Sequence, residues 1–222
     1  MKIQSLGILG LGSRSTLFYI KELNRLYHQK KGGYSTCPFK LLNTNFDVIN
    51  NLLPVTSTKL EVILRNYLVE LQHLKVDAIL IPNITLHETI DKITLGAEII
   101  HPVYVTIAKL KESRVNKVVL LGSLHTMESS YLKDVFKNES IAVVLPSKED
   151  RVFIDNVRKH IYEETESQDL LKEYNDIIEK YSVNYAVVLA CTELSVGWKA
   201  ESSTIIFDMS RIQIARTIEN ID

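Results

Sequence analysis

The sequence has little cysteine, almost no net charge and no long apolar run. Two cysteines among 222 residues are too few for a disulfide framework, which favours a reducing, cytoplasmic compartment. Because 26 basic residues balance 27 acidic ones, a broad basic surface for nucleic acid is not expected. No apolar run reaches the ~20 residues that cross a bilayer, which argues against a membrane partner. The amino-terminal stretch predicts a strand entering a glycine loop rather than a signal peptide.

What is present is an ordinary globular composition. The chain is 45% hydrophobic and 24% charged, which supplies a sizeable core for one large domain or two small ones. Its six histidines are scattered at spacings that do not suit zinc, so no metal is expected. The first glycine loop also lacks the dinucleotide fingerprint, because Ser15 stands where a third glycine is needed.

One stretch, Asn184–Leu194, organises the interpretation. Its apolar, mostly β-branched residues end abruptly in Cys191, Thr192 and Glu193. Such a run predicts a strand that is buried on both faces of a parallel sheet. The three polar residues then lie at the carboxyl end of the strand, where open α/β sheets bind their ligands.

The segment Val76–Thr85 repeats this pattern 108 positions earlier, with Asn83 at the place of Cys191. A second glycine loop, Gly122–Met127, likewise follows the first one after about 110 positions. The chain therefore predicts two copies of one strand-and-helix design, in which Asn83 and Cys191 are matching positions.

Strand and helix patterns alternate along the whole chain, which predicts a parallel α/β fold. The expected strands are Ile3–Leu9, Pro38–Asn43, Asp77–Pro82, Lys117–Leu121, Ile141–Leu145, the run before Cys191, and Thr204–Phe207. The expected helices are Leu17–Tyr27, Thr58–Leu74, Val105–Leu110, Asp150–Glu164, Asp169–Lys180 and Asp208–Ile221. We expect two similar lobes, residues 1–107 joined by 208–222 and residues 108–207. Each would be a parallel sheet flanked by helices, with the active-site cleft between them.

Chemistry in this cleft would centre on Cys191. A thiol has an ordinary pKa of ~8.5 and acts as a base once backbone N–H groups or a helix terminus lower that pKa. The alternative is that Cys191 is a small buried hydrophobic residue, as most cytosolic cysteines are. Glu193 is a candidate partner of the thiol, whereas Cys37, directly before Pro38, is interpreted as structural.

Short hydroxyl side chains at strand ends and helix starts are candidates for holding a substrate carboxylate, together with free N–H groups. They are Ser15, Thr16, Thr85, Ser123, Thr126 and Thr192. Serine and threonine at such places are also routine helix caps, so both roles stay open. His87 and His125 each follow a strand end and either contact the ligand or lie as loop residues.

Five segments, in matching order and spacing, resemble the aspartate/glutamate racemase superfamily. They are GILGLGSRST, IPNITLH, LLGSLHTMES, LACTEL and IIFDMSRI, and together they span nearly the whole chain. The resemblance implies a cofactor-independent enzyme of two pseudo-symmetric α/β lobes. In that family each lobe presents a cysteine to one face of the substrate α-carbon: one thiolate removes the α-proton and the opposite thiol delivers a proton. A small amino acid substrate and a catalytic Cys191 are implied, and we expect the protein to form a homodimer.

The sequence departs from this family at the first cysteine, which corresponds to Asn83. An amide has no usable pKa and cannot serve as a proton-transfer base. Certain related racemases carry threonine there and favour an L-amino acid. The related arylmalonate decarboxylases carry glycine there and use only the second cysteine, which protonates a planar enediolate from one face.

Further departures concern substrate contacts. Ile84 stands where the family usually has asparagine, and Gln213 where a histidine is common. The basic residue that pairs with the substrate side-chain carboxylate has no clear counterpart. By chemistry alone the candidates are Arg14, Lys148 and Arg151.

Three hypotheses follow from the sequence. The first is an amino-acid racemase acting on aspartate, glutamate or a close relative, with Cys191 as one acid/base and a water held by Asn83 serving the other face. The second is a one-cysteine decarboxylase or isomerase of a small carboxylate. The third is a ligand-binding member of the fold that has lost catalysis.

Overall fold

The structure is a computed structural model that describes residues 2–198 and 206–221. The chain divides into two compact units, Met1–His101 with Gln213–Asp222 and Pro102–Ile212. These units and the lobes expected from the sequence differ only in the assignment of residues 102–107 and 208–212. The reason is packing: helix α5 (Pro102–Glu112) contacts strand β8 (Ile206–Asp208) of the second unit, so residues 102–107 group with that unit.

The first unit is built on a four-stranded parallel sheet with the order β2-β1-β3-β4. Its strands are β1 (Leu6–Gly10), β2 (Lys40–Asn43), β3 (Ala78–Leu80) and β4 (Glu98–Ile99). All five residues of β1 are buried, as expected for a central strand that is covered on both faces. The sequence did not predict β4, because two residues are too few to show a periodic pattern.

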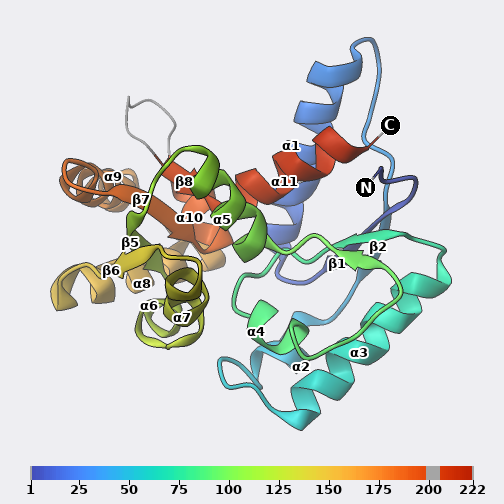
Figure 1. The fold of residues 1–222 in the computed structure, drawn as a ribbon, viewed down its shortest axis with the longest axis horizontal. Helices are drawn as coiled ribbons and strands as arrows, with labels where there is room; N and C mark the ends of the chain where they lie inside the picture. The colour runs from blue at the N-terminus through green and yellow to red at the C-terminus, as the bar shows by residue number, and fades with distance from the viewer. Residues whose placement is uncertain (1, 199–205, 222) are drawn as a thin grey trace. The chain divides into compact units, whose positions relative to one another are not determined.

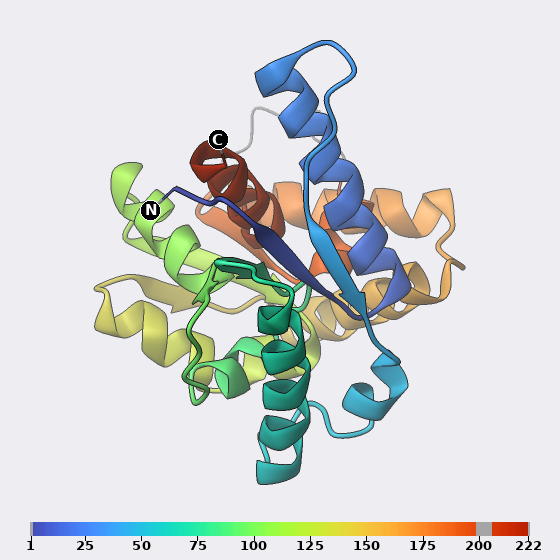
Figure 2. The ribbon, with the colours of Figure 1, turned by 90° about the vertical axis from the view of Figure 1, so that its right-hand side faces the viewer.

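Helices cover both faces of this sheet. They are α1 (Ser13–Lys31), α2 (Phe46–Asn50), α3 (Thr58–His73) and α4 (His87–Ile90). Figure 1 shows α1 on one side of β1 and β2 and α3 on the other, and Figure 2 shows α1 running along these two strands. The apolar stripe of α3 packs against the side chains of β1 and β3 that point to its side of the sheet. Together these residues form one hydrophobic core. That stripe consists of Leu60, Leu64, Leu68 and Leu71, all fully buried.

The second unit repeats the topology with the order β6-β5-β7-β8, again all parallel. Its strands are β5 (Lys117–Gly122), β6 (Ala142–Val144), β7 (Ala186–Ala190) and β8. Its helices are α5, α6 (Leu124–Glu128), α7 (Tyr131–Asn138), α8 (Lys148–Glu163), α9 (Gln168–Ser182) and α10 (Thr192–Gly197), and α11 (Met209–Asn220) begins there. The predicted α/β fold of two parallel sheets flanked by helices is thereby confirmed.

Helix α10 lies unusually close to α8. A Cβ atom added at Gly197 would lie 2.6 Å from Cδ1 of Ile161, a separation that side-chain atoms do not tolerate without a shift. Buried α8 residues join the core that also contains β5, β7 and Cys191; they include Ile154, Val157 and Ile161. The end of α10 is thus packed against α8, and Cys191, just before the start of α10, shares the same core.

The last ten residues of the first unit come from the end of the chain. Gln213 is fully buried, accepts a hydrogen bond from the hydroxyl of Tyr19 at 2.5 Å, and donates one to the carbonyl of Ile100. Near the end of the chain, Ile221 forms a parallel bridge with Ile3. Gln213 is thus tied into the packing of this unit.

Element boundaries agree with the sequence-based expectations to within a few residues, with two larger differences. Helix α1 is longer at both ends than Leu17–Tyr27, and α5 is longer than Val105–Leu110. The expected strand Thr204–Phe207 lies partly outside the described residues, and the strand is observed at Ile206–Asp208. Within residues 2–198 and 206–221, no helix combines the length and the apolar character needed to cross a membrane.

Candidate active site

Cys191 is the residue between the carboxyl end of β7 and the first turn of α10. Its backbone is extended, with φ −156° and ψ 131°, and its side chain is only 9% exposed. The thiol donates a hydrogen bond from Sγ to Oε2 of Glu193 at 3.0 Å. The thiol therefore has a proton acceptor within hydrogen-bond distance.

Two opposing influences set the protonation state of Cys191. Burial raises the pKa of the thiol well above its usual range, and the negative charge and hydrogen bond of Glu193 raise it further. The positive charge of Arg158 and the backbone N–H of Leu194 act in the opposite direction, but they do not reverse the shift. Cys191 is therefore a neutral thiol at pH 7, the form that delivers a proton.

Arg158, on α8, is the cation of this site, and the sequence did not single it out. Its Nε atom lies 3.0 Å from Oδ1 of Asp155, and it interacts electrostatically with Cys191 and Glu193. Burial alone would lower the pKa of Arg158, yet these negative charges raise it overall, so the guanidinium stays charged. The sequence around Arg158 shows only an acidic and a basic residue at helical spacing, Asp155 and Arg158. This pair gives no indication of an interaction with Cys191, which lies 33 positions further along the chain.

The basic residues proposed from the sequence occupy other places. Arg151 pairs with Glu128 at 2.8 Å. Lys148 is exposed in the first turn of α8, and Arg14 is half-buried in the first turn of α1. Their assignment to the substrate side-chain carboxylate stays a prediction.

Asn83 follows the carboxyl end of β3, as Cys191 follows β7, but its side chain has a local partner. Its Oδ1 atom accepts a hydrogen bond from the N–H of Leu86 at 3.1 Å, and its carbonyl oxygen lies 2.8 Å from Nδ1 of His87. The amide oxygen thus stabilises the turn that leads into α4. Asn83 and Cys191 belong to different units, and their pairing across one substrate stays a prediction.

The hydroxyls of the first glycine loop are engaged within that loop. Ser15 donates from Oγ to the carbonyl of Gly12 at 3.0 Å, and Oγ1 of Thr16 accepts from the N–H of Leu11 at 3.0 Å. Both side chains are buried. Neither hydroxyl caps the helix, because Gly12 is the N-cap of α1 and no described side chain accepts from the free N–H groups of its first turn. The expected capping by Ser15 or Thr16 is therefore wrong, and both hydroxyls instead bond to the backbone of the loop.

The second glycine loop differs, because Ser123 does cap helix α6. Oγ of Ser123 accepts from the N–H of Thr126 at 3.1 Å, and the two hydroxyls lie 2.8 Å apart. The N–H of Leu124 donates to Oδ1 of Asp155 at 3.1 Å, so the loop is bonded to the same carboxylate that holds Arg158.

Thr192 is buried beside Cys191, and Oγ of Ser210 donates to its Oγ1 at 3.2 Å. Thr85 is half-buried in the turn after β3. Because β5 and β7 are neighbouring parallel strands, Ser123, Thr126, Cys191 and Thr192 follow carboxyl ends on one edge of the second sheet. In the first unit β1 and β3 are neighbours, so Ser15, Thr16, Asn83 and Thr85 follow carboxyl ends on one edge of the first sheet.

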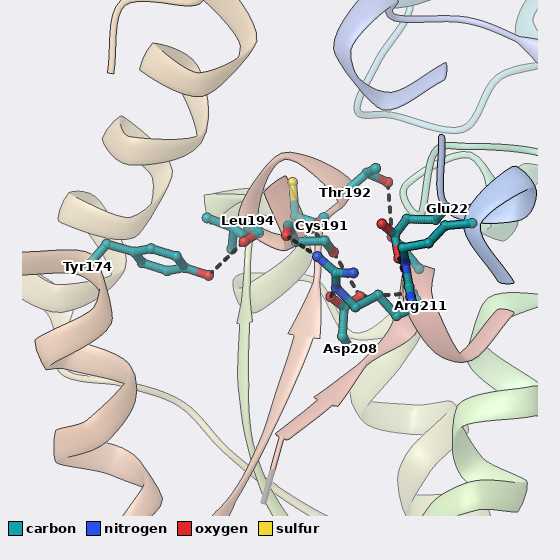
Figure 3. A network of polar contacts seen from close by, with 10 residues as sticks. Glu22, Tyr174, Cys191, Thr192, Leu194, Asp208 and Arg211 are labelled. Carbon is teal, nitrogen blue, oxygen red and sulfur yellow. Dashed lines mark hydrogen bonds and ion pairs between the residues drawn. The ribbon is translucent and has the colours of Figure 1, made fainter. Parts of the chain in front are cut away.

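Polar side chains from α9 and from the junction of β8 and α11 bond to α10 (Figure 3). The hydroxyl of Tyr174, on α9, donates to the carbonyl of Leu194 at 3.2 Å. The buried carboxylate of Asp208 accepts from Oγ of Ser195 at 2.8 Å and lies 3.2 Å from Nε of Arg211. These contacts hold the helix that begins at Cys191 in one position.

His87 does not lie free at the site but is fully buried in the first unit. Its ring meets that of His101 edge to face at 4.5 Å, and Nε2 of His101 lies 3.4 Å from Oδ1 of Asp91. Burial lowers the pKa of His87 well below its usual range. Burial also lowers the pKa of His101 to about 4, although the carboxylate of Asp91 acts in the opposite direction. Both imidazoles are neutral at pH 7.

This buried pair predicts acid sensitivity of the first unit. The unfolded chain binds a proton at the ordinary histidine pKa of ~6.5, whereas folded His101 does so only near 4. Stability should therefore fall as the pH falls from about 6.5 to about 4, by about 3 kcal/mol from His101 alone. The His101→Phe variant keeps a ring against His87 and should lose less stability over this range in urea unfolding. His73→Gln, an exposed substitution on α3, is the control and should behave as wild type.

Among the described residues, no three His, Cys, Asp or Glu side chains converge as a metal site. Cys37, the other cysteine, is buried before β2, and burial raises the pKa of its thiol to about 11.

Comparisons with known proteins agree with this architecture. No curated protein matches the chain. An aspartate racemase homologue from Pyrococcus horikoshii OT3 superposes with a TM-score of 0.83 at 23% identity, over 99% of this chain and 98% of that one. The aspartate racemase of Picrophilus torridus gives 0.80 at 17% identity, over 97% and 93%. The glutamate racemase of Aquifex pyrophilus gives 0.55 at 16% identity, over 99% and 84%.

At these identities the superpositions establish the fold. The family is established by the sequence itself, because residues 8–214 match the pattern of one family from the first glycine loop into α11. This range includes Asn83, Cys191 and both glycine loops. The chain belongs to the Asp/Glu/Hydantoin racemase family.

Proposed function

We propose that the protein is a cofactor-independent racemase of aspartate, glutamate or a similar small amino acid, with Cys191 as its acid/base. The observation that carries this proposal is the arrangement around the sulfur. A buried thiol at the carboxyl end of β7 is hydrogen-bonded to Glu193 and lies within the electrostatic influence of Arg158. Such a group can exchange a proton with a substrate carbon while water is largely excluded.

In the proposed reaction the α-carbon of the amino acid lies against Cys191. The thiolate removes the α-proton, and the electron pair of the C–H bond delocalises into the substrate carboxylate. Return of a proton to the opposite face inverts the centre. Asn83 serves that opposite face, where its amide can orient a water molecule but cannot itself exchange a proton.

The substrate carboxylate is proposed to bind at the glycine loops and at the first turns that follow the strands. The hydroxyls of Ser15, Thr16, Ser123 and Thr126 are bonded within their loops, so they pre-organise the backbone around the anion. Thr85 and Thr192, which come directly after the two matching strand ends, are the remaining hydroxyl candidates.

One observation favours a second candidate, a one-cysteine decarboxylase or isomerase of a small carboxylate. Cys191 rests as a neutral thiol, and the carbonyl oxygen of the Asn83 amide already stabilises a turn. A neutral thiol opposite a group without a usable pKa suits the protonation of a planar enediolate from one face. In such an enzyme the carbanion would come from loss of CO2 or of another proton.

Hydrogen exchange at the α-carbon tests the proposal. The protein is incubated with L-aspartate or L-glutamate in D2O, and deuterium at the α-position and inversion are followed by NMR and chiral chromatography. A racemase incorporates deuterium and forms the D-enantiomer. Exchange without inversion would favour the one-cysteine decarboxylase or isomerase. Absence of exchange for every amino acid tested would contradict both enzyme proposals and favour a ligand-binding protein.

A further inference from the structure

The charge that stabilises ionised Cys191 comes from a different helix than the one that carries the cysteine. Glu193, two residues along on α10, accepts the thiol proton in a hydrogen bond and so favours the neutral form. The cation that acts against it is Arg158 on α8. For the sulfur to act as a base, its S–H bond must break and the electron pair must stay on sulfur.

Arg158 is held in place by its surroundings. Asp155, which is only 7% exposed, lies 3.0 Å from its Nε atom and also accepts from the N–H of Leu124 and from Lys159 at 2.7 Å. Burial alone would raise the pKa of Asp155, but these donors lower it overall, so the carboxylate is charged and fixed. The Arg158 side chain is itself 26% exposed, so the guanidinium is partly shielded from water.

The position of α8 relative to the sulfur is equally constrained. The close approach at Gly197 leaves no room between α10 and Ile161, one turn beyond Arg158 on α8. Val157, adjacent to Arg158, shares a buried core with Cys191. The helix that carries the cation is therefore packed against the core that contains Cys191.

We propose that Arg158 is a positioning residue that stabilises the thiolate of Cys191, with Asp155 holding its guanidinium in place. When the thiol proton passes to Oε2 of Glu193, 3.0 Å away, Glu193 becomes a neutral acid and the negative charge moves to sulfur. The positive charge of Arg158 then acts on the thiolate instead of the carboxylate, and the net charge of the site is unchanged. The role of Arg158 is thus to let one cysteine serve as both base and acid.

Other titratable and charged groups lie on the elements that are packed around Cys191 and Arg158, and they must be considered in any pH profile. They are Glu193 on α10, Asp155 and Lys159 on α8, Tyr174 on α9, and Asp208 with Arg211 at the start of α11. Tyr174 is neutral at pH 7, because burial and the charges of Asp208 and Cys191 raise its pKa. Arg158 is the cation among these that acts directly on the sulfur.

The test is the pH dependence of Cys191 alkylation by iodoacetamide, which reacts with the thiolate. Reaction of the Cys191 peptide is followed by mass spectrometry, so Cys37 does not interfere. Arg158→Met should raise the midpoint of the alkylation-versus-pH curve by roughly one pH unit. At pH values below this midpoint, alkylation should be roughly tenfold slower than in wild type. Arg158→Lys keeps the positive charge but lacks the planar guanidinium group. Its midpoint should therefore lie between those of wild type and Arg158→Met. Glu193→Gln should move the midpoint down.

Lys159→Met is the matched control, because Lys159 also binds Asp155 but has no electrostatic contact with Cys191 among those described. It should leave the midpoint at the wild-type value. An unchanged midpoint in a folded Arg158→Met variant would overturn the proposal, and so would an equal shift in Lys159→Met. Circular dichroism of each variant establishes that it is folded, and Arg158→Lys decides the outcome if Arg158→Met does not fold.

This inference rests on the proposed function only in taking Cys191 as the reacting group. Alkylation needs no amino acid substrate, so the two can fail separately. A shifted midpoint without α-proton exchange in D2O would retain the role of Arg158 and remove the proposed racemase. Exchange with the same pH profile in wild type and Arg158→Met would remove the role of Arg158 alone.

Discussion

Replacing Cys191 by alanine is expected to abolish α-proton exchange with every amino acid that the protein accepts. In the proposed mechanism the sulfur at the carboxyl end of β7 exchanges the α-proton, and general acid–base catalysis contributes about 10²–10⁴-fold. Removing the sulfur also leaves Glu193 without its hydrogen-bond donor. Exchange is measured by NMR in D2O with L-aspartate and L-glutamate.

Two further variants separate chemistry from folding. Cys191→Ser keeps the size of the side chain and a hydrogen-bond donor, but its hydroxyl does not ionise in this pH range, so it should be as inactive as Cys191→Ala. Cys37→Ala removes the other buried cysteine and should retain exchange, because its thiol lies before β2, in the first unit. If Cys191→Ala exchanges α-protons at the wild-type rate, the proposed mechanism is wrong.

Introducing a thiol at the matching position should have the opposite effect. Asn83→Cys is expected to raise the rate of racemisation, by up to about 10²–10⁴-fold, since a group that exchanges protons replaces an amide that does not. The gain is expected to fall short of this range to the extent that Ile84 or a missing cationic partner misplaces the substrate. Interconversion of D- and L-aspartate is followed by chiral chromatography.

The structure also supplies the control for this experiment. The Asn83 amide oxygen accepts from the N–H of Leu86, and loss of that bond alone changes the turn before α4. Asn83→Ser can still accept this hydrogen bond but offers no ionisable group, so it should not raise the rate. A wild-type protein that already racemises fast, with no gain in Asn83→Cys, would show that another group serves this face.

The fold follows from patterns that are local in the sequence. The apolar run before Cys191 and the leucine stripe of α3 each identify their element, because burial on two faces or on one stripe imposes a distinct spacing of apolar residues. The repeat at 108 positions then predicts the two matching sheets. The strand β4 was missed because its pairing with β3 depends on the surrounding structure rather than on its two residues.

The candidate site could be predicted only in part. Cys191 was identifiable because a polar cluster directly follows a buried strand, and its bond to Glu193 is a contact between near neighbours. Arg158 could not be found in this way, because its effect on Cys191 arises from the packing of α8 against α10. The hydroxyls of Ser15 and Ser123 illustrate the opposite problem. Both form local bonds to the backbone, but only Ser123 caps a helix, and the same sequence pattern also fits an anion site.

The interrupted first unit has a consequence for how the protein is made. A ribosome completes Pro102–Ile212 before it adds the ten residues Gln213–Asp222 that belong to the first unit. The first unit therefore lacks the partner of Tyr19 and Ile100 until translation has passed the whole of the second unit. Its packing cannot be completed while only its amino-terminal 101 residues have been made.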